Sequence, residues 1–197
     1  MTWLLDAGSG FIRQPLTWQR QKRAREAYWR RISRPGSTAW LTIPCAQMNN
    51  RSWLVDEAGL RTVAKSIATQ LQRGDLVFLS GDLGTGKTTF AQAAIRTMGF
   101  KGVVNSPTFT LVEVYQTDYG ELVHLDLYRL ESLTELENIG IRDYLDSQSI
   151  CLIEWPQKGS GLLPAADMVV DLVYAGDRRR LGVTVRAGRG LDLEIIQ

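Results

Sequence analysis

The 197-residue chain has little histidine, little cysteine and no long apolar run. His124 is its single histidine, which excludes every metal site built from several histidines. Cys45 and Cys151 lie far apart in sequence, so they predict neither a disulfide framework nor a cysteine metal site. No stretch approaches the roughly 18 consecutive apolar residues of a membrane span. We therefore expect a soluble, cytoplasmic protein with no membrane partner.

The chain also lacks a strong overall charge, but its charge is unevenly distributed. A net charge of +2 is too small to indicate nucleic-acid binding by electrostatics alone. Residues 1–47 nevertheless carry eight Lys or Arg against two Asp or Glu, and they show no helical or strand period. Three interpretations stay open for this basic extension: a disordered arm that contacts RNA or a partner, an organellar transit peptide, or sequence upstream of a true start at Met48.

Residues 48–197 alternate between helical and strand patterns, which predicts one α/β domain. Asp56 is a suitable helix cap, and the helix predicted by the apolar stripe that follows it is expected to end at Gly74. Short apolar runs are typical of strands buried on both faces of a parallel sheet. The expected strands are 76–79, 109–115, 122–128, 150–153, 168–174, 181–185 and 191–196, and the other expected helices are 87–98 and an acidic one from Ser132 or Thr134 to about Gly140.

The strongest chemical signal is the segment Gly81–Thr88, which matches the phosphate-binding loop G-x-x-x-x-G-K-[ST] in full. Its glycines allow positive φ angles and let backbone N–H groups approach phosphates. Lys87 supplies a point charge for the β- and γ-phosphates, and Thr88 offers a hydroxyl to Mg²⁺. The loop follows a buried strand and opens a helix, whose positive end attracts anions. The sequence therefore predicts nucleotide binding.

Two acidic residues at strand ends are the natural metal partners of this loop. Glu154 closes an apolar run as the acid of a Walker B strand does, where it holds Mg²⁺ or orients the attacking water. Asp126 follows His124 on the same face of a strand, two residues later. Each carboxylate could instead be an ordinary surface acid.

Three further residues have two interpretations each. His124 is either a hydrogen-bonded structural residue or a catalytic one. Arg129 is either an internal arginine finger or a partner of a neighbouring acid. Trp155 either stacks beside the nucleotide or packs at the edge of the sheet.

Several blocks of the chain, in order and spacing, resemble the TsaE family of small bacterial ATPases in tRNA threonylcarbamoyladenosine biosynthesis. The resemblance covers about Met48 to the C-terminus, and no block in residues 1–47 contributes to it. It implies a P-loop NTPase fold with a mostly parallel central sheet flanked by helices, and with antiparallel C-terminal strands. The blocks are 81–90, 106–113, 124–130, 135–137, 140–144 and 153–156.

The resemblance implies a role for each matching residue. Thr108 would belong to a switch segment near the γ-phosphate, Glu154 would support hydrolysis, and Trp155 would neighbour the nucleotide. Lys87, Asp126 and Glu154 would be the catalytic residues, and Thr88, Asp126 and Glu154 would hold Mg²⁺. ATP would be bound by Gly81, Asp82, Leu83, Gly84, Thr85, Gly86, Lys87, Thr88, Thr89, Thr108 and Trp155.

The resemblance also implies a partner, the TsaB–TsaD complex, through which the protein meets tRNA indirectly. Slow ATP hydrolysis would drive or reset that complex, which modifies adenosine 37. A small-molecule kinase on the same fold is the alternative function. Such a kinase usually needs a lid with several arginines, whereas residues 89–156 contain only Arg96, Arg129 and Arg142. This composition favours the ATP-driven switch.

Overall fold

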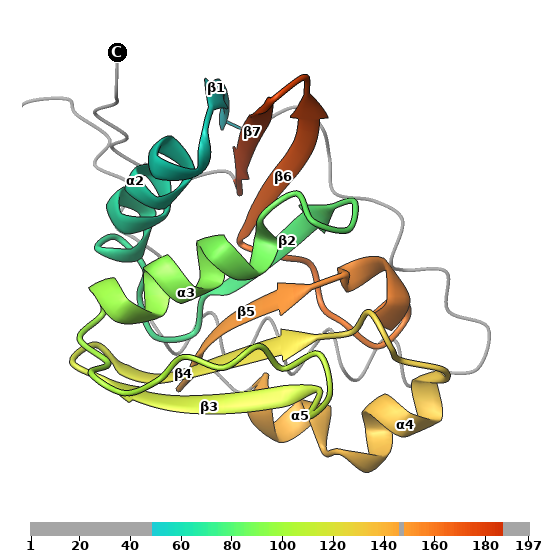
Figure 1. Ribbon diagram of the computed structural model, residues 1–197. Helices are drawn as coiled ribbons and strands as arrows, with labels where there is room; N and C mark the ends of the chain where they lie inside the picture. Colours follow the sequence, from blue (N-terminus) through green and yellow to red (C-terminus); the bar gives the residue numbers. More distant parts are fainter. Residues whose placement is uncertain (1–48, 146–147, 187–197) are drawn as a thin grey trace, which may run out of the picture.

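Seven β-strands form one sheet in the order β1-β7-β6-β2-β5-β4-β3, with helices on both faces (Figure 1). The computed structural model describes residues 49–145 and 148–186. The basic extension expected over 1–47 and the strand expected over 191–196 lie outside these ranges. The elements are β1 (Asn49–Val55), α2 (Glu57–Ala68), β2 (Leu76–Gly81), α3 (Lys87–Thr97), β3 (Val112–Thr117), β4 (Gly120–Asp126), α4 (Leu133–Asn138), α5 (Ile141–Tyr144), β5 (Ile150–Glu154), the 3₁₀-helix η2 (Pro156–Gly159), β6 (Met168–Ala175) and β7 (Arg178–Val185).

The centre of the sheet is parallel, and its two ends are antiparallel. β6, β2, β5 and β4 run in one direction as neighbours. β7 pairs with β6 in the opposite direction, so the expected antiparallel C-terminal strands are confirmed. β6 also extends the parallel core on its other side, against β2. Every residue of β5 is buried, which explains the unbroken apolar run 150–153 that precedes Glu154.

Two apolar layers sandwich the sheet, because successive side chains of a strand point to opposite faces. α2 and α3 lie together on one face, above Val77 and Leu79 of β2. α4 and α5 cover part of the other face and pack against Leu76 and its neighbours. The phosphate-loop segment links β2 to α3 and therefore sits at the carboxyl end of the parallel strands. Ligands of open α/β sheets bind at this edge.

α2 begins as expected but ends earlier than expected. The Asp56 carboxylate accepts a hydrogen bond of 2.8 Å from the Gly59 N–H and caps the helix. The helix ends at Ala68 with Thr69 as its C-cap, so the predicted end at Gly74 was wrong. After the helix, the backbone N–H groups of Gln70 and Leu71 bond the carbonyls three residues earlier instead of four. Leu71 is still buried in this tight turn. The apolar stripe therefore continues past the end of the helix.

The boundaries of β3 and β4 also differ from those expected. β3 begins three residues later than predicted, because Leu111 has a φ of 62° and cannot continue a strand. β4 ends at Asp126, whose carboxylate accepts a bond of 3.0 Å from the Tyr128 N–H and turns the chain. The acidic helix α4 is capped by Ser132, which decides between the two expected starts.

The edge strand β1, the short helix α5 and η2 were not predicted from the sequence. Among the described strands β1 pairs with β7 alone, and its first four residues are polar, so its sequence shows no clear alternation. Within residues 49–145 and 148–186, no helix has the length and apolar character needed to cross a membrane.

Candidate functional site

The loop from Gly81 to Thr88 leaves β2 and returns directly into α3. Gly84 and Gly86 have φ angles of 78° and 107°, in the left-handed region that glycine adopts without strain. Gly86 is the N-cap of α3, and no side chain caps this helix. The first N–H groups of a helix have no partner inside the helix. An anion at this position would therefore meet unpaired donors and the positive end of the helix dipole.

Lys87 closes the loop from within. Its Nζ donates hydrogen bonds to the carbonyl oxygens of Gly81 (2.8 Å) and Asp82 (2.7 Å). The same ammonium lies 4.1 Å from the centre of the Trp155 ring, a cation–π contact. Burial lowers the pKa of the Lys87 ammonium, and Glu154, Asp126 and Asp82 act in the opposite direction. The loop therefore holds a buried positive charge beside two carboxylates.

Asp126 and Glu154 end two neighbouring parallel strands and lie directly opposite each other in the sheet. Both are buried, and like charges in such a position are destabilising unless they are compensated. Thr88 Oγ1 donates to Glu154 Oε2 at 3.0 Å, so the phosphate loop contacts this pair. Thr108 Oγ1 donates to Asp126 Oδ2 at 2.8 Å. This bond joins the segment before β3 to the same pair of carboxylates.

The oxygen donors at this edge suit Mg²⁺. This ion is usually held by one or two carboxylates, with phosphate oxygens and water completing its shell. Thr88, Asp126 and Glu154 supply one hydroxyl and two carboxylates beside the phosphate loop. In the part of the chain that the structure describes, no three His, Cys, Asp or Glu side chains form a metal-holding group by themselves. The residues therefore fit an ion that a phosphate ligand helps to hold.

A cleft of about 410 Å³ opens over these groups. It unites most of the predicted site residues, drawn from the loop, from both strand ends and from the segment that contains Thr108. Gly81, Asp82 and Thr85 belong to the loop but do not line the cleft; Thr85 is buried, and its hydroxyl donates to the Asp82 carbonyl at 2.9 Å. The lining residues are Leu83, Gly84, Gly86, Lys87, Thr88, Thr89, Thr108, Asp126, Tyr128, Arg129, Glu154 and Trp155.

Gly81 is the last residue of β2 and lies opposite Leu172 of β6. Its φ is 134°, and a Cβ at this position would lie 2.2 Å from the Leu172 carbonyl oxygen. Gly176 also has a positive φ, of 66°, but a Cβ there would meet nothing within 4 Å. Glycine at residue 81 is therefore required by contact as well as by backbone conformation.

We expect Gly81→Ala to lower the free energy of unfolding by roughly 2–4 kcal/mol more than Gly176→Ala. Both substitutions place a Cβ on a positive-φ backbone, but only the one at residue 81 brings it against other atoms, the Leu172 carbonyl oxygen and Thr85 Oγ1, and its φ of 134° is also further from the left-handed helical region. Urea denaturation of the two variants measures it. Equal losses of stability would show that the loop can move away from β6 at no cost.

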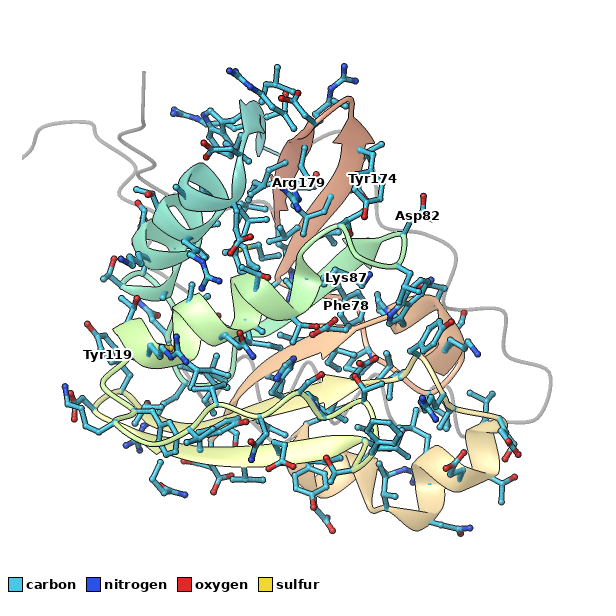
Figure 2. The ribbon with its side chains drawn as sticks, in the orientation of Figure 1. Phe78, Asp82, Lys87, Tyr119, Tyr174 and Arg179 are labelled. Atoms are coloured by element: carbon cyan, nitrogen blue, oxygen red, sulfur yellow. The ribbon has the colours of Figure 1, made fainter. Side chains whose placement is uncertain are left out.

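Tyr174 and Arg179 support the loop from outside, and sequence reasoning missed both (Figure 2). The Tyr174 hydroxyl donates to the Leu83 carbonyl at 3.2 Å, and Arg179 Nε donates to the Thr85 carbonyl at 3.0 Å. They come from β6 and β7, more than 90 residues further along the chain. No spacing or motif in the sequence signals these contacts, which only the sheet order creates.

Aromatic residues line the other side of the cleft. The Tyr128 and Trp155 rings lie 5.0 Å apart, and Trp155 has a φ of 55°. The Arg129 guanidinium lies 4.3 Å from the centre of the Phe109 ring, which is 80% exposed. Trp155 borders the cleft and also packs against the apolar layer beneath it, so both of its interpretations stay open. Arg129 contacts an aromatic ring. Tyr128 and Phe109 were not singled out from the sequence.

Comparison with known proteins identifies close relatives. The family model of threonylcarbamoyl adenosine biosynthesis protein TsaE matches residues 54–181. The tRNA threonylcarbamoyladenosine biosynthesis protein TsaE of Haemophilus influenzae is 40% identical over 146 residues, which cover 72% of this chain and 92% of that protein. The protein of the same name from Bacillus subtilis is 36% identical over 134 residues, covering 68% and 84%. The crystal structure of YdiB from Bacillus subtilis superimposes with a TM-score of 0.57 at 30% identity, covering 70% of this chain and 86% of that one.

Proposed function

This chain belongs to the TsaE family, and from that premise we propose that it binds ATP with Mg²⁺ in the cleft and hydrolyses it. The family acts in tRNA threonylcarbamoyladenosine biosynthesis, as the names of its members state. One observation carries the proposal. Thr88 of the phosphate loop donates directly to Glu154, which lies opposite Asp126 on the neighbouring strand. A phosphate loop and a pair of carboxylates therefore meet at one point.

Each group has a distinct task in this proposal. Lys87 would leave the carbonyls of Gly81 and Asp82 and bind the β- and γ-phosphates through charge-assisted hydrogen bonds. The Thr88 hydroxyl oxygen would hold the metal while its O–H continues to donate a hydrogen bond to Glu154. Bound Mg²⁺ would neutralise phosphate charge. Glu154 would orient the attacking water and accept its proton.

The hydrogen bond between Thr108 and Asp126 suggests how bound nucleotide would change the conformation of a surface segment. Thr108 also hydrogen-bonds Ser106 at 2.7 Å, and the segment ends at Leu111 in a left-handed conformation. Metal and γ-phosphate at Asp126 would change the partners available to Thr108 and reorder this segment, as in other nucleotide switches. We infer that the segment signals to the TsaB–TsaD complex, and that tRNA is met only through that complex.

Phosphate release from ATP by the full chain, alone and with TsaB and TsaD from the same source, tests this function. We expect slow release by the chain alone and at least about tenfold faster release with the pair, since partner-supplied order is a common source of acceleration. The Lys87→Ala chain with the same partners controls for contaminating ATPases. No release under either condition would contradict the proposal.

The same assay separates the ATPase from a kinase. Transfer of the γ-phosphate to an added nucleoside, instead of its release as free phosphate, would favour the kinase alternative. Arg129 is the single arginine among the described residues that line the cleft, whereas kinase lids usually carry several.

A further inference from the structure

His124 is a fully buried histidine of β4, two residues before the end of the strand. Its Nε2 lies 2.9 Å from Glu154 Oε1. An ionised carboxylate only accepts hydrogen bonds, so a ring that donates to it in this contact would carry a hydrogen on Nε2. Its other nitrogen, Nδ1, has no hydrogen-bond partner among the described residues. Among the described residues, Glu154 is therefore the hydrogen-bond partner of this buried ring.

The strand register shows how His124 reaches Glu154, although Leu152 is the residue directly opposite it. His124 and Asp126 share one face of β4, since side chains alternate along a strand. Directly opposite on β5, His124 faces Leu152, and Asp126 faces Glu154. The imidazole therefore reaches diagonally by two residues along β5, a span that long side chains cover.

Both oxygens of Glu154 are consequently held. His124 contacts Oε1, and Thr88 donates to Oε2. A glutamate side chain has three torsions, and a single contact would leave its carboxylate free to rotate. Two contacts, from β4 on one side and from α3 on the other, fix the plane of the carboxylate.

We infer that His124 is a positioning residue for ATP hydrolysis, which holds the Glu154 carboxylate in the orientation that serves the bound nucleotide. The inference rests on the proposed function. A leucine would fill the same space in the apolar layer without an unpartnered nitrogen, and an unpartnered buried nitrogen is costly. A buried histidine is worth this free-energy cost where its other nitrogen orients a functional side chain. Residues that hydrogen-bond metal-binding side chains from behind have such a role.

Two substitutions at residue 124 test this role with the full chain and its partners. His124→Leu removes the hydrogen-bond donor and keeps an apolar side chain. His124→Gln places an amide N–H near the position of Nε2. We expect His124→Leu to lower kcat for phosphate release by roughly 10–100-fold, with ATP affinity measured in EDTA unchanged within about threefold. We expect His124→Gln to recover kcat to within about fivefold of the native value.

A double-mutant cycle with Glu154→Gln distinguishes positioning from general support of the fold. If His124 acts through Glu154, His124→Leu lowers kcat no further in the Glu154→Gln background. It should also lower the melting temperature less there, since no buried charge is left unpaired. If His124→Leu does not fold, His124→Asn replaces it, because its shorter amide reaches the position of Nδ1 only.

Each result has a defined meaning. Native kcat in His124→Leu, or a Gln variant no more active than the Leu or Asn variant, would overturn the inference. Additive losses in the cycle would also overturn it. The proposed function fails separately, if the native chain with its partners releases no phosphate or if Glu154→Gln keeps the native rate.

Discussion

Lys87→Ala should weaken ATP binding by at least about 100-fold, equivalent to about 2.7 kcal/mol. The loop would lose its only buried ammonium among the described residues, where screening by water is weak. Backbone N–H groups would remain, but they carry partial charges only. Titration of ATP into the variant in the presence of Mg²⁺, followed by calorimetry, measures the loss.

Lys65→Ala is the matched control for this experiment. Lys65 is an exposed lysine in the last turn of α2 and does not line the cleft. We expect its ATP affinity to equal that of the native chain. Lys87 also binds the carbonyls of Gly81 and Asp82, so the melting temperature of both variants should be compared. ATP affinity of a folded Lys87→Ala chain within about threefold of native would contradict the role of this lysine in phosphate binding.

Glu154→Gln should spare ATP binding and lower kcat for hydrolysis by at least about 100-fold. The amide keeps the size of the side chain and can still accept from Thr88, so the cleft should keep its shape. It cannot accept a proton from water, and it carries no charge for the metal. Single-turnover phosphate release measures the rate, and equilibrium ATP binding measured in EDTA measures the affinity.

The outcome is read as a contrast with Lys87→Ala, because one variant should lose affinity and the other should lose rate. Glu57→Gln, an exposed surface exchange on α2, controls for loss of an acid elsewhere. An unchanged turnover in Glu154→Gln would assign hydrolysis to another group, and Asp126, on the opposite strand, would be the first to test. Strongly weakened ATP binding in EDTA would instead give Glu154 a structural role in the loop.

The most predictable parts of this protein are those whose information is local. Buried strands such as β2 and β5 appear as apolar runs because parallel strands are covered on both faces. The start of α2 follows from one capping aspartate. Element boundaries were harder to predict where the local sequence pattern and the tertiary contacts disagree. Leu71 continues an apolar stripe after its helix has ended, and Leu111 interrupts an apolar strand pattern with a positive φ.

The site divides in the same way. The loop from Gly81 to Thr88 is eight consecutive residues that match one phosphate-binding motif, so sequence alone predicts it. The supporting contacts of Tyr174 and Arg179 join residues more than 90 positions apart, and the sequence pattern contains no trace of them. The sequence left His124 with two possible roles and no partner, and the structure supplies the partner, Glu154.

Sequence by itself determined the family, the phosphate-loop motif and the α/β class, because each depends on residues close together or on motifs in a specific order. It singled out Asp126 and Glu154 but left both open as surface acids, and the structure buries both. Only the tertiary structure decided that Asp126 and Glu154 lie opposite each other and that Thr88, Thr108 and His124 each hold one of their oxygens. The reason is physical. Strand order and register set these contacts, and they depend on how the whole chain packs its two apolar layers.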